Sequence, residues 1–148
     1  MGRLEALTRD LRRFADLDAE RRRFALRAVV GAPLVEAALA AAGLRRTLAL
    51  IDSLPRSPRR EPVAAGEGAR LVAGVYRHHV VRGACLPRAV LQYALHRLDG
   101  AEVALEVGAR RIDGVVEAHA WIRGDERAEA YEPLRRMDEG ALASADPS

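Results

Sequence analysis

The sequence predicts a single α+β domain, in which helices come first and a small antiparallel sheet comes last. Three observations support this fold class. A chain of 148 residues holds one domain with a real core but is too short for two ordinary ones. Apolar residues recur at helical spacing before Gly100 and alternate with polar residues after it, and the chain contains no internal repeat.

The N-terminal segment 1–55 is predicted to be helical. A first short helix is indicated by apolar residues at three- and four-residue steps, which are Leu4, Leu7, Leu11 and Phe14. Asp18 is suited to cap a second helix, because its carboxylate can accept from the unpaired N–H groups at a helix start. That helix is expected to break or bend at Gly31 and Pro33, before an alanine-rich helical stretch continues to Pro55.

The remainder of the chain divides into a linker, a core segment and a tail. Residues 56–68 mix proline, arginine, glycine and serine without periodicity, which is typical of a surface linker. The core segment is expected to span 69–140. Residues 141–148 form a polar tail to which we assign no function.

Two helices and three strands are predicted within the core segment. One helix covers 69–81, and the next begins near Cys85 and is closed by Gly100 as its C-cap. After Gly100, valine, leucine and isoleucine alternate with polar residues in three short stretches, which predicts three antiparallel strands. The sheet is expected to pack on the helix that begins near Cys85.

Composition excludes several classes of function. The 24 basic residues, all of them arginine, are offset by 21 acidic residues, and the formal net charge of +3 is too balanced to predict nucleic-acid binding. The sequence has no glycine-rich phosphate loop and no cysteine–histidine metal spacing, so we expect neither cofactor nor metal. With one cysteine, no secretory signal and no apolar run of about 20 residues, the chain is expected to be cytoplasmic without a membrane span.

Cys85 is the first candidate for chemistry. A lone cysteine is more often a buried apolar residue than a nucleophile. At the first turn of a helix, however, unpaired backbone N–H groups and the helix dipole favour the thiolate form. Pro87 supports a helix start close to Cys85, since a missing N–H costs little in the first turn.

A nucleophilic thiol needs a base, and the chain has four histidines. His96 lies three turns along the helix from Cys85, on the order of 16 Å away, and is excluded. His78 and His79 fit ordinary surface histidines. His119 lies on a predicted strand between Ala118 and Ala120, which leaves room beside it, and is the preferred base, although a buried structural histidine is the alternative.

The expected hairpin register supplies a carboxylate for His119. If Asp125 and Glu126 form a two-residue turn, Glu132 lies directly opposite His119 on the neighbouring strand. A turn shifted by one residue keeps Glu132 on the His119 face. Glu132 is therefore the predicted orienting acid of a Cys85–His119–Glu132 triad.

These residues resemble a known family. The stretches "CLPRAVLQYALHRLDGAEVALEVGAR" and "EAHAWI" are similar to the leader peptidases of lasso peptide biosynthesis, the transglutaminase-like B proteins, and the helical segment before them is similar as well. The resemblance implies a transglutaminase-like core, with Cys85 as nucleophile and His119 as base. Tyr131 stands where the family places its acid, with Glu132 directly after it.

The resemblance also implies an activity and partners. Such an enzyme is a cysteine protease that removes the leader from a precursor peptide by cutting at the leader–core junction, and an ATP-dependent lasso cyclase then closes the ring. Because the chain starts with the helical segment, it is expected to need a separate leader-recognition protein. Two alternatives stay open: a catalytically weak adaptor in the same complex, and a transglutaminase-like acyltransferase. Gln92 is predicted to be a solvent-facing or packing residue, and the second oxyanion donor is left open. Trp121 could line a substrate groove, but a lone tryptophan on a sheet face is more often a core residue, and we assign it no role.

Overall fold

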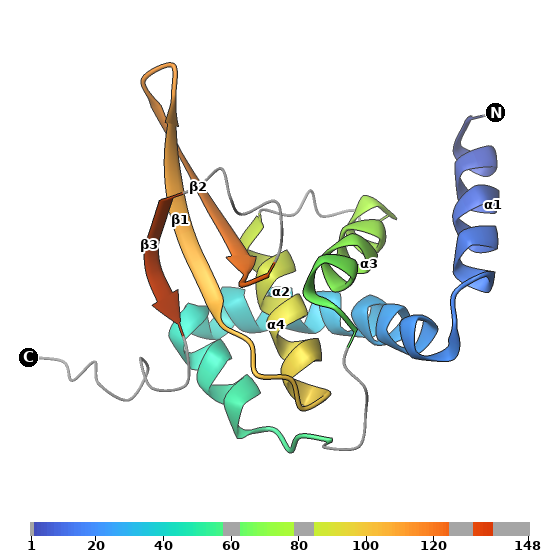
Figure 1. The fold of residues 1–148 in the computed structure, drawn as a ribbon, viewed down its shortest axis with the longest axis horizontal. Helices are drawn as coiled ribbons and strands as arrows, with labels where there is room; N and C mark the ends of the chain where they lie inside the picture. Colours follow the sequence, from blue (N-terminus) through green and yellow to red (C-terminus); the bar gives the residue numbers. More distant parts are fainter. Residues whose placement is uncertain (1, 58–62, 79–84, 125–131, 138–148) are drawn as a thin grey trace, which may run out of the picture.

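The computed structural model describes residues 2–57, 63–78, 85–124 and 132–137 and confirms the α+β class. Figure 1 shows the helices gathered on one side of a small twisted sheet, with the first helix projecting from the body. The elements in chain order are α1 (Gly2–Ala15), α2 (Ala19–Ser53), α3 (Ala65–His78), α4 (Cys85–Leu98), β1 (Leu105–Ile112), β2 (Val115–Ile122) and β3 (Glu132–Met137). The predicted tail, 141–148, lies outside the described residues, and α3 begins inside the predicted linker.

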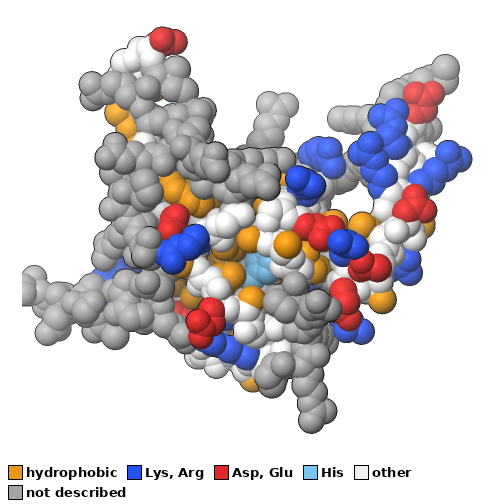
Figure 2. Space-filling view, in the orientation of Figure 1, with side chains coloured by type: hydrophobic (Ala, Val, Ile, Leu, Met, Phe, Trp, Pro, Cys, Tyr) orange, Lys and Arg blue, Asp and Glu red, His pale blue; other side chains and the backbone are white. Residues whose placement is uncertain are grey.

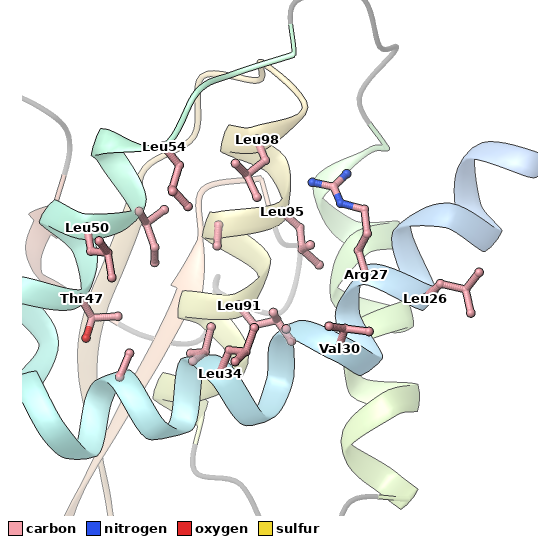
Figure 3. A pocket seen from close by; sticks show the side chains of 15 residues that line it. Leu26, Arg27, Val30, Leu34, Thr47, Leu50, Leu54, Leu91, Leu95 and Leu98 are labelled. Atoms are coloured by element: carbon pink, nitrogen blue, oxygen red, sulfur yellow. The ribbon is translucent and has the colours of Figure 1, made fainter.

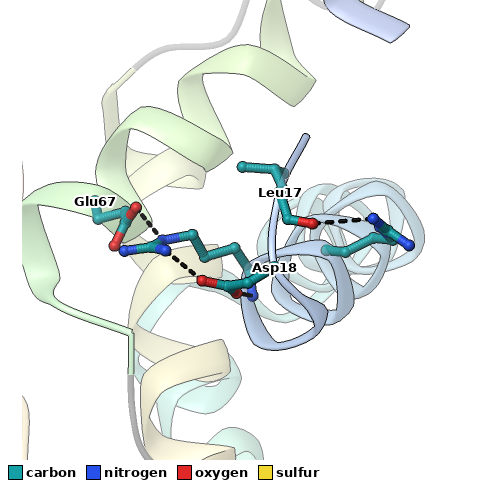
Figure 4. Close-up of polar contacts among 5 residues, drawn as sticks. Leu17, Asp18 and Glu67 are labelled. Carbon is teal, nitrogen blue, oxygen red and sulfur yellow. Dashed lines mark hydrogen bonds and ion pairs between the residues drawn. The ribbon is translucent and has the colours of Figure 1, made fainter. Parts of the chain in front are cut away.

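The start of α2 is fixed by the cap that the sequence predicts. Asp18 has extended backbone angles, and its side chain accepts a hydrogen bond of 2.9 Å from the backbone N–H of Arg21. That hydrogen bond lowers the pKa of the Asp18 carboxyl below its ordinary value. The Arg21 side chain lies between Asp18 and Glu67, pairing with both, and so connects the start of α2 to the first turn of α3 (Figure 4).

The predicted break at Gly31 and Pro33 is wrong, because α2 continues through both residues. A Cβ on Gly31 would lie 2.7 Å from Leu91 Cδ1, so this glycine allows α2 to approach α4 closely and does not end the helix. The break lies at Gly43 instead, whose φ of 73° and ψ of 173° are not helical. A positive φ is accessible to glycine at little cost, and α2 therefore folds as two limbs.

α4 is the central helix of the molecule. Nine consecutive residues of this helix, Ala89 to Arg97, are buried, and α4 packs against α2, α3 and β2. Gly100 closes the helix as predicted: with φ of 84°, it lets the N–H of Gly100 bond the carbonyl of Arg97 and the N–H of Ala101 bond that of His96. This is the hydrogen-bond pattern of a Schellman C-cap.

Three polar residues on the buried face of α4 have specific partners. Tyr93 donates from its hydroxyl to Asp52 Oδ1 at 2.7 Å, and Arg97 Nε lies 2.6 Å from the same oxygen. Gln92, predicted to be a solvent-facing or packing residue, is buried and donates from Nε2 to the carbonyl of Ala65 at 2.7 Å. Because a buried polar group costs free energy unless it is bonded, these contacts explain how Gln92, Tyr93 and Arg97 are kept inside the core. His96 differs, because its buried Nε2 has no hydrogen-bond partner among the described residues.

The three strands form an antiparallel sheet in the order β2-β1-β3. β1 and β2 are joined by a two-residue turn, Asp113 and Gly114, both with positive φ, which matches the type I′ hairpin that an Asp-Gly pair favours. β3 pairs with the other edge of β1, with an irregularity in register between Val107 and Gly108. The sheet packs on α4 as expected, mainly through β2.

The surface combines charged and apolar features. On the face that Figure 2 shows, arginine side chains gather toward the end where α1 lies, interspersed with acidic ones.

α2 is long and apolar enough to cross a membrane by length and composition. It contains a window of mean hydropathy 1.6, and 28% of that window is buried inside the protein. Buried helices of globular proteins can be equally long and apolar, and α2 contributes Phe24, Ala28 and Leu48 to the hydrophobic core. Absence of a membrane span stays a prediction.

Candidate active site

Cys85 is the first residue of α4, in agreement with the predicted helix start. Its side chain is half-buried and packs against the hydrophobic core. The first N–H groups of an α-helix have no partner within the helix, so a group bound beside Cys85 meets backbone donors. Such donors can stabilise both a thiolate and the oxyanion of a tetrahedral intermediate.

His119 lies on β2, the strand that packs most closely on α4. It is half-buried, and its imidazole stacks on the indole of Trp121, with ring centroids 6.0 Å apart and planes 20° apart. Stacking places both side chains on the same face of the sheet, as the two-residue spacing of a strand requires. The structure thus packs the helix of Cys85 against the strand of His119. The residues of β2 that join the core cluster with α4 are Ala120 and Ile122, which alternate with His119 along the strand.

The predicted strand pairing that placed Glu132 directly opposite His119 is wrong. β3 pairs with β1 and not with β2, so β1 separates Glu132 from His119. Along the sheet, His119 is in line with Gly108 and Pro133, while Glu132 is in line with Ala109. The predicted hairpin turn at 125–126 and the side chain of Glu132 lie outside the described residues, so its place in a triad stays a prediction.

Glu106 is a carboxylate near His119 that the sequence did not single out. It is the cross-strand partner of Trp121 on β1 and is buried. Cross-strand partners share a face of the sheet, so Glu106 lies diagonally opposite His119. The signal in the sequence was present but weak: Glu106 alternates with apolar residues in a strand, which normally indicates a solvent-facing position.

The other histidines do not compete with His119 among the described residues. His96 is buried in the core of the helices, with its ring 5.2 Å from that of Phe24, and burial lowers its pKa. His78 is the last residue of α3, but its side chain, like the whole of His79, lies outside the described residues. Of the two histidines whose side chains the structure describes, His119 is therefore the better partner for Cys85.

A groove of about 560 Å³ lies between the two limbs of α2 and α4 (Figure 3). Its wall is almost entirely aliphatic, with Leu34, Leu50 and Leu95 among the lining residues. Neither Cys85 nor His119 lines it, so the groove is separate from the candidate active site. Within the described part of the chain, no group of three or more histidine, cysteine or acidic residues could hold a metal ion.

The comparisons with known proteins agree with this arrangement at the level of the superfamily. The family model of the transglutaminase-like superfamily matches residues 31–138, which include α4, the sheet and most of α2. No curated protein and no solved structure matches the chain significantly. Because the family match covers more than half of the sequence, the chain belongs to the transglutaminase-like superfamily.

Proposed function

We propose that this protein is a cytoplasmic cysteine peptidase that removes the leader from a lasso peptide precursor. It acts with a separate leader-recognition protein and an ATP-dependent cyclase. The superfamily, which includes cysteine proteases and acyltransferases, supports a thiol-based acyl-transfer reaction. The finer assignment rests on the resemblance of "CLPRA" and "HAW" to the lasso leader peptidases.

One observation carries the proposal: Cys85 begins a helix that packs directly on the strand of His119. Cys85 is also the only cysteine in the chain. A thiol at a helix start and an imidazole on a strand packed against that helix supply a nucleophile and a base on rigid elements, two of the groups that covalent catalysis requires.

The reaction would proceed in two stages. His119 takes the proton of the Cys85 thiol, and the sulfur attacks the carbonyl at the leader–core junction while backbone N–H groups at the start of α4 bind the oxyanion. Collapse of the intermediate breaks the C–N bond, and His119 returns the proton to the amine that leaves. Water then attacks the thioester, with His119 again as the base, which frees the leader and restores the thiol.

The test is mass spectrometry of the co-encoded precursor, incubated with this protein and its recognition partner. Wild-type protein should release leader and core as two products, and Cys85→Ala should leave the precursor intact. Glu132→Gln tests whether Glu132 is a member of a triad, and a slower but measurable release is expected if its carboxylate orients the base. A precursor left uncut by the wild type in the assembled complex would favour the adaptor, and a product carrying an added amine would favour acyl transfer.

A further inference from the structure

Glu106 is a buried carboxylate that accepts hydrogen bonds from at least two described residues. Trp121 Nε1 donates to its Oε2 at 2.9 Å, and Arg123 Nε donates to its Oε1 at 3.0 Å. The residue is 8% exposed, whereas the Arg123 side chain is half exposed. A buried carboxylate is stable only when it is paired and hydrogen-bonded, so the contacts with Trp121 and Arg123 are what allow Glu106 to be buried.

Trp121 connects this carboxylate to the candidate base. Its indole is 3% exposed and is fixed at one end by the hydrogen bond to Glu106. Its ring face stacks on the imidazole of His119. An indole free to rotate about its side-chain bonds would offer no fixed plane, whereas one bonded through Nε1 presents a defined surface to the next ring.

We propose that Glu106 is a positioning residue, which fixes the indole of Trp121 and through it the plane of the His119 imidazole. The proposal rests on the proposed function, because it takes His119 as the base for Cys85. Glu106 does not touch the substrate in this role. A base must meet the thiol in a narrow range of geometry, and a partner that locks its rotamer supplies that precision.

The chain offers a matched control beside the C-terminal half of α4, whereas Cys85 begins that helix. Asp52 is also a largely buried carboxylate that interacts with one aromatic donor, Tyr93, and one arginine, Arg97. It belongs to α2, and its partners Tyr93 and Arg97 lie two or more turns along α4 from Cys85. Asp52→Ala therefore removes a similar set of interactions without reaching the base.

The experiment uses the single cysteine and the single tryptophan of the full-length protein as reporters. The first readout is the rate of Cys85 alkylation by iodoacetamide at neutral pH. Glu106→Ala should lower it by about tenfold to a hundredfold, the range for loss of a partner that orients a working imidazole. Glu106→Gln keeps an oxygen acceptor for Trp121 and should restore a rate close to that of the wild type.

The second readout is tryptophan fluorescence, because a protonated imidazole in contact quenches an indole. Acidification should quench Trp121 in the wild type and in Asp52→Ala, and His119→Ala should abolish that quenching. Glu106→Ala should weaken it, because the two rings are no longer held together.

Two results would overturn the positioning role: a wild-type alkylation rate in folded Glu106→Ala, or an equal loss of rate in Asp52→Ala. A wild type that does not cut the precursor would refute the proposed function alone, since fluorescence still decides whether Glu106 holds Trp121 against His119.

Discussion

Gly68 occupies a position in α3 where an alanine should be harmful despite its better helix propensity. A Cβ at this position would lie 2.6 Å from Nε2 of His96 and 3.2 Å from Cζ of Phe24. Neither ring can move easily, because both residues are 1% exposed and their rings lie against each other. Among the described residues, a Cβ on Gly74 in the same helix would meet only Arg77 Nη2, at 3.5 Å, which is an ordinary contact distance.

The pair of variants separates steric strain from helix propensity. Replacing glycine by alanine within a helix stabilises it by about 1 kcal/mol, whereas overpacking a core costs about 1–3 kcal/mol. Gly74→Ala should therefore raise the free energy of unfolding by about 1 kcal/mol. Gly68→Ala should fall about 1–3 kcal/mol below Gly74→Ala, which leaves it as stable as the wild type at best.

Urea denaturation followed by circular dichroism measures both values, and equal slopes confirm that the two variants unfold from comparable states. The difference in free energy of unfolding between the two variants is more informative than either value. Both variants replace glycine by alanine in the same helix, so most of the contribution of helix propensity cancels in that difference. Equal stability of Gly68→Ala and Gly74→Ala would refute the close packing of α3 against His96.

Three further predictions concern stability. Burial lowers the pKa of His96, and the charge of Asp99 opposes this shift. As the pH falls below about 6.5, the unfolded chain therefore binds a proton that the folded chain does not, so the free energy of unfolding in urea should decrease and then level off below the folded pKa. His96→Leu should remove this pH dependence. Tyr93→Phe loses a hydrogen bond to a carboxylate and should lower the free energy of unfolding by about 1.5–3 kcal/mol in urea titrations. Leu91→Ala, in the core, should cost about 2–5 kcal/mol and lower Tm in calorimetry, with an unchanged Tm arguing against its burial.

The types of most elements could be predicted because they depend on local patterns. The cap at Asp18 and the helix end at Gly100 use residues within one turn, so their signals survive without tertiary context. The start of α4 at Cys85 belongs to the same class. The break in α2 was misplaced because glycine serves two purposes: Gly31 admits Leu91, while Gly43 takes a positive φ.

The sequence by itself determined the kinds of elements, their order, and the placing of a cysteine at a helix start and a histidine on a strand. Only the tertiary structure decided which strand edge β3 occupies, and with it the failure of the register that had placed Glu132 opposite His119. The physical reason is the range of the interactions. A tight turn fixes the pairing of its own two strands, as Asp113 and Gly114 do, whereas a longer connection leaves the edge to be chosen by packing of the whole sheet. The bond from Trp121 to Glu106 likewise depends on residues that meet only across that sheet.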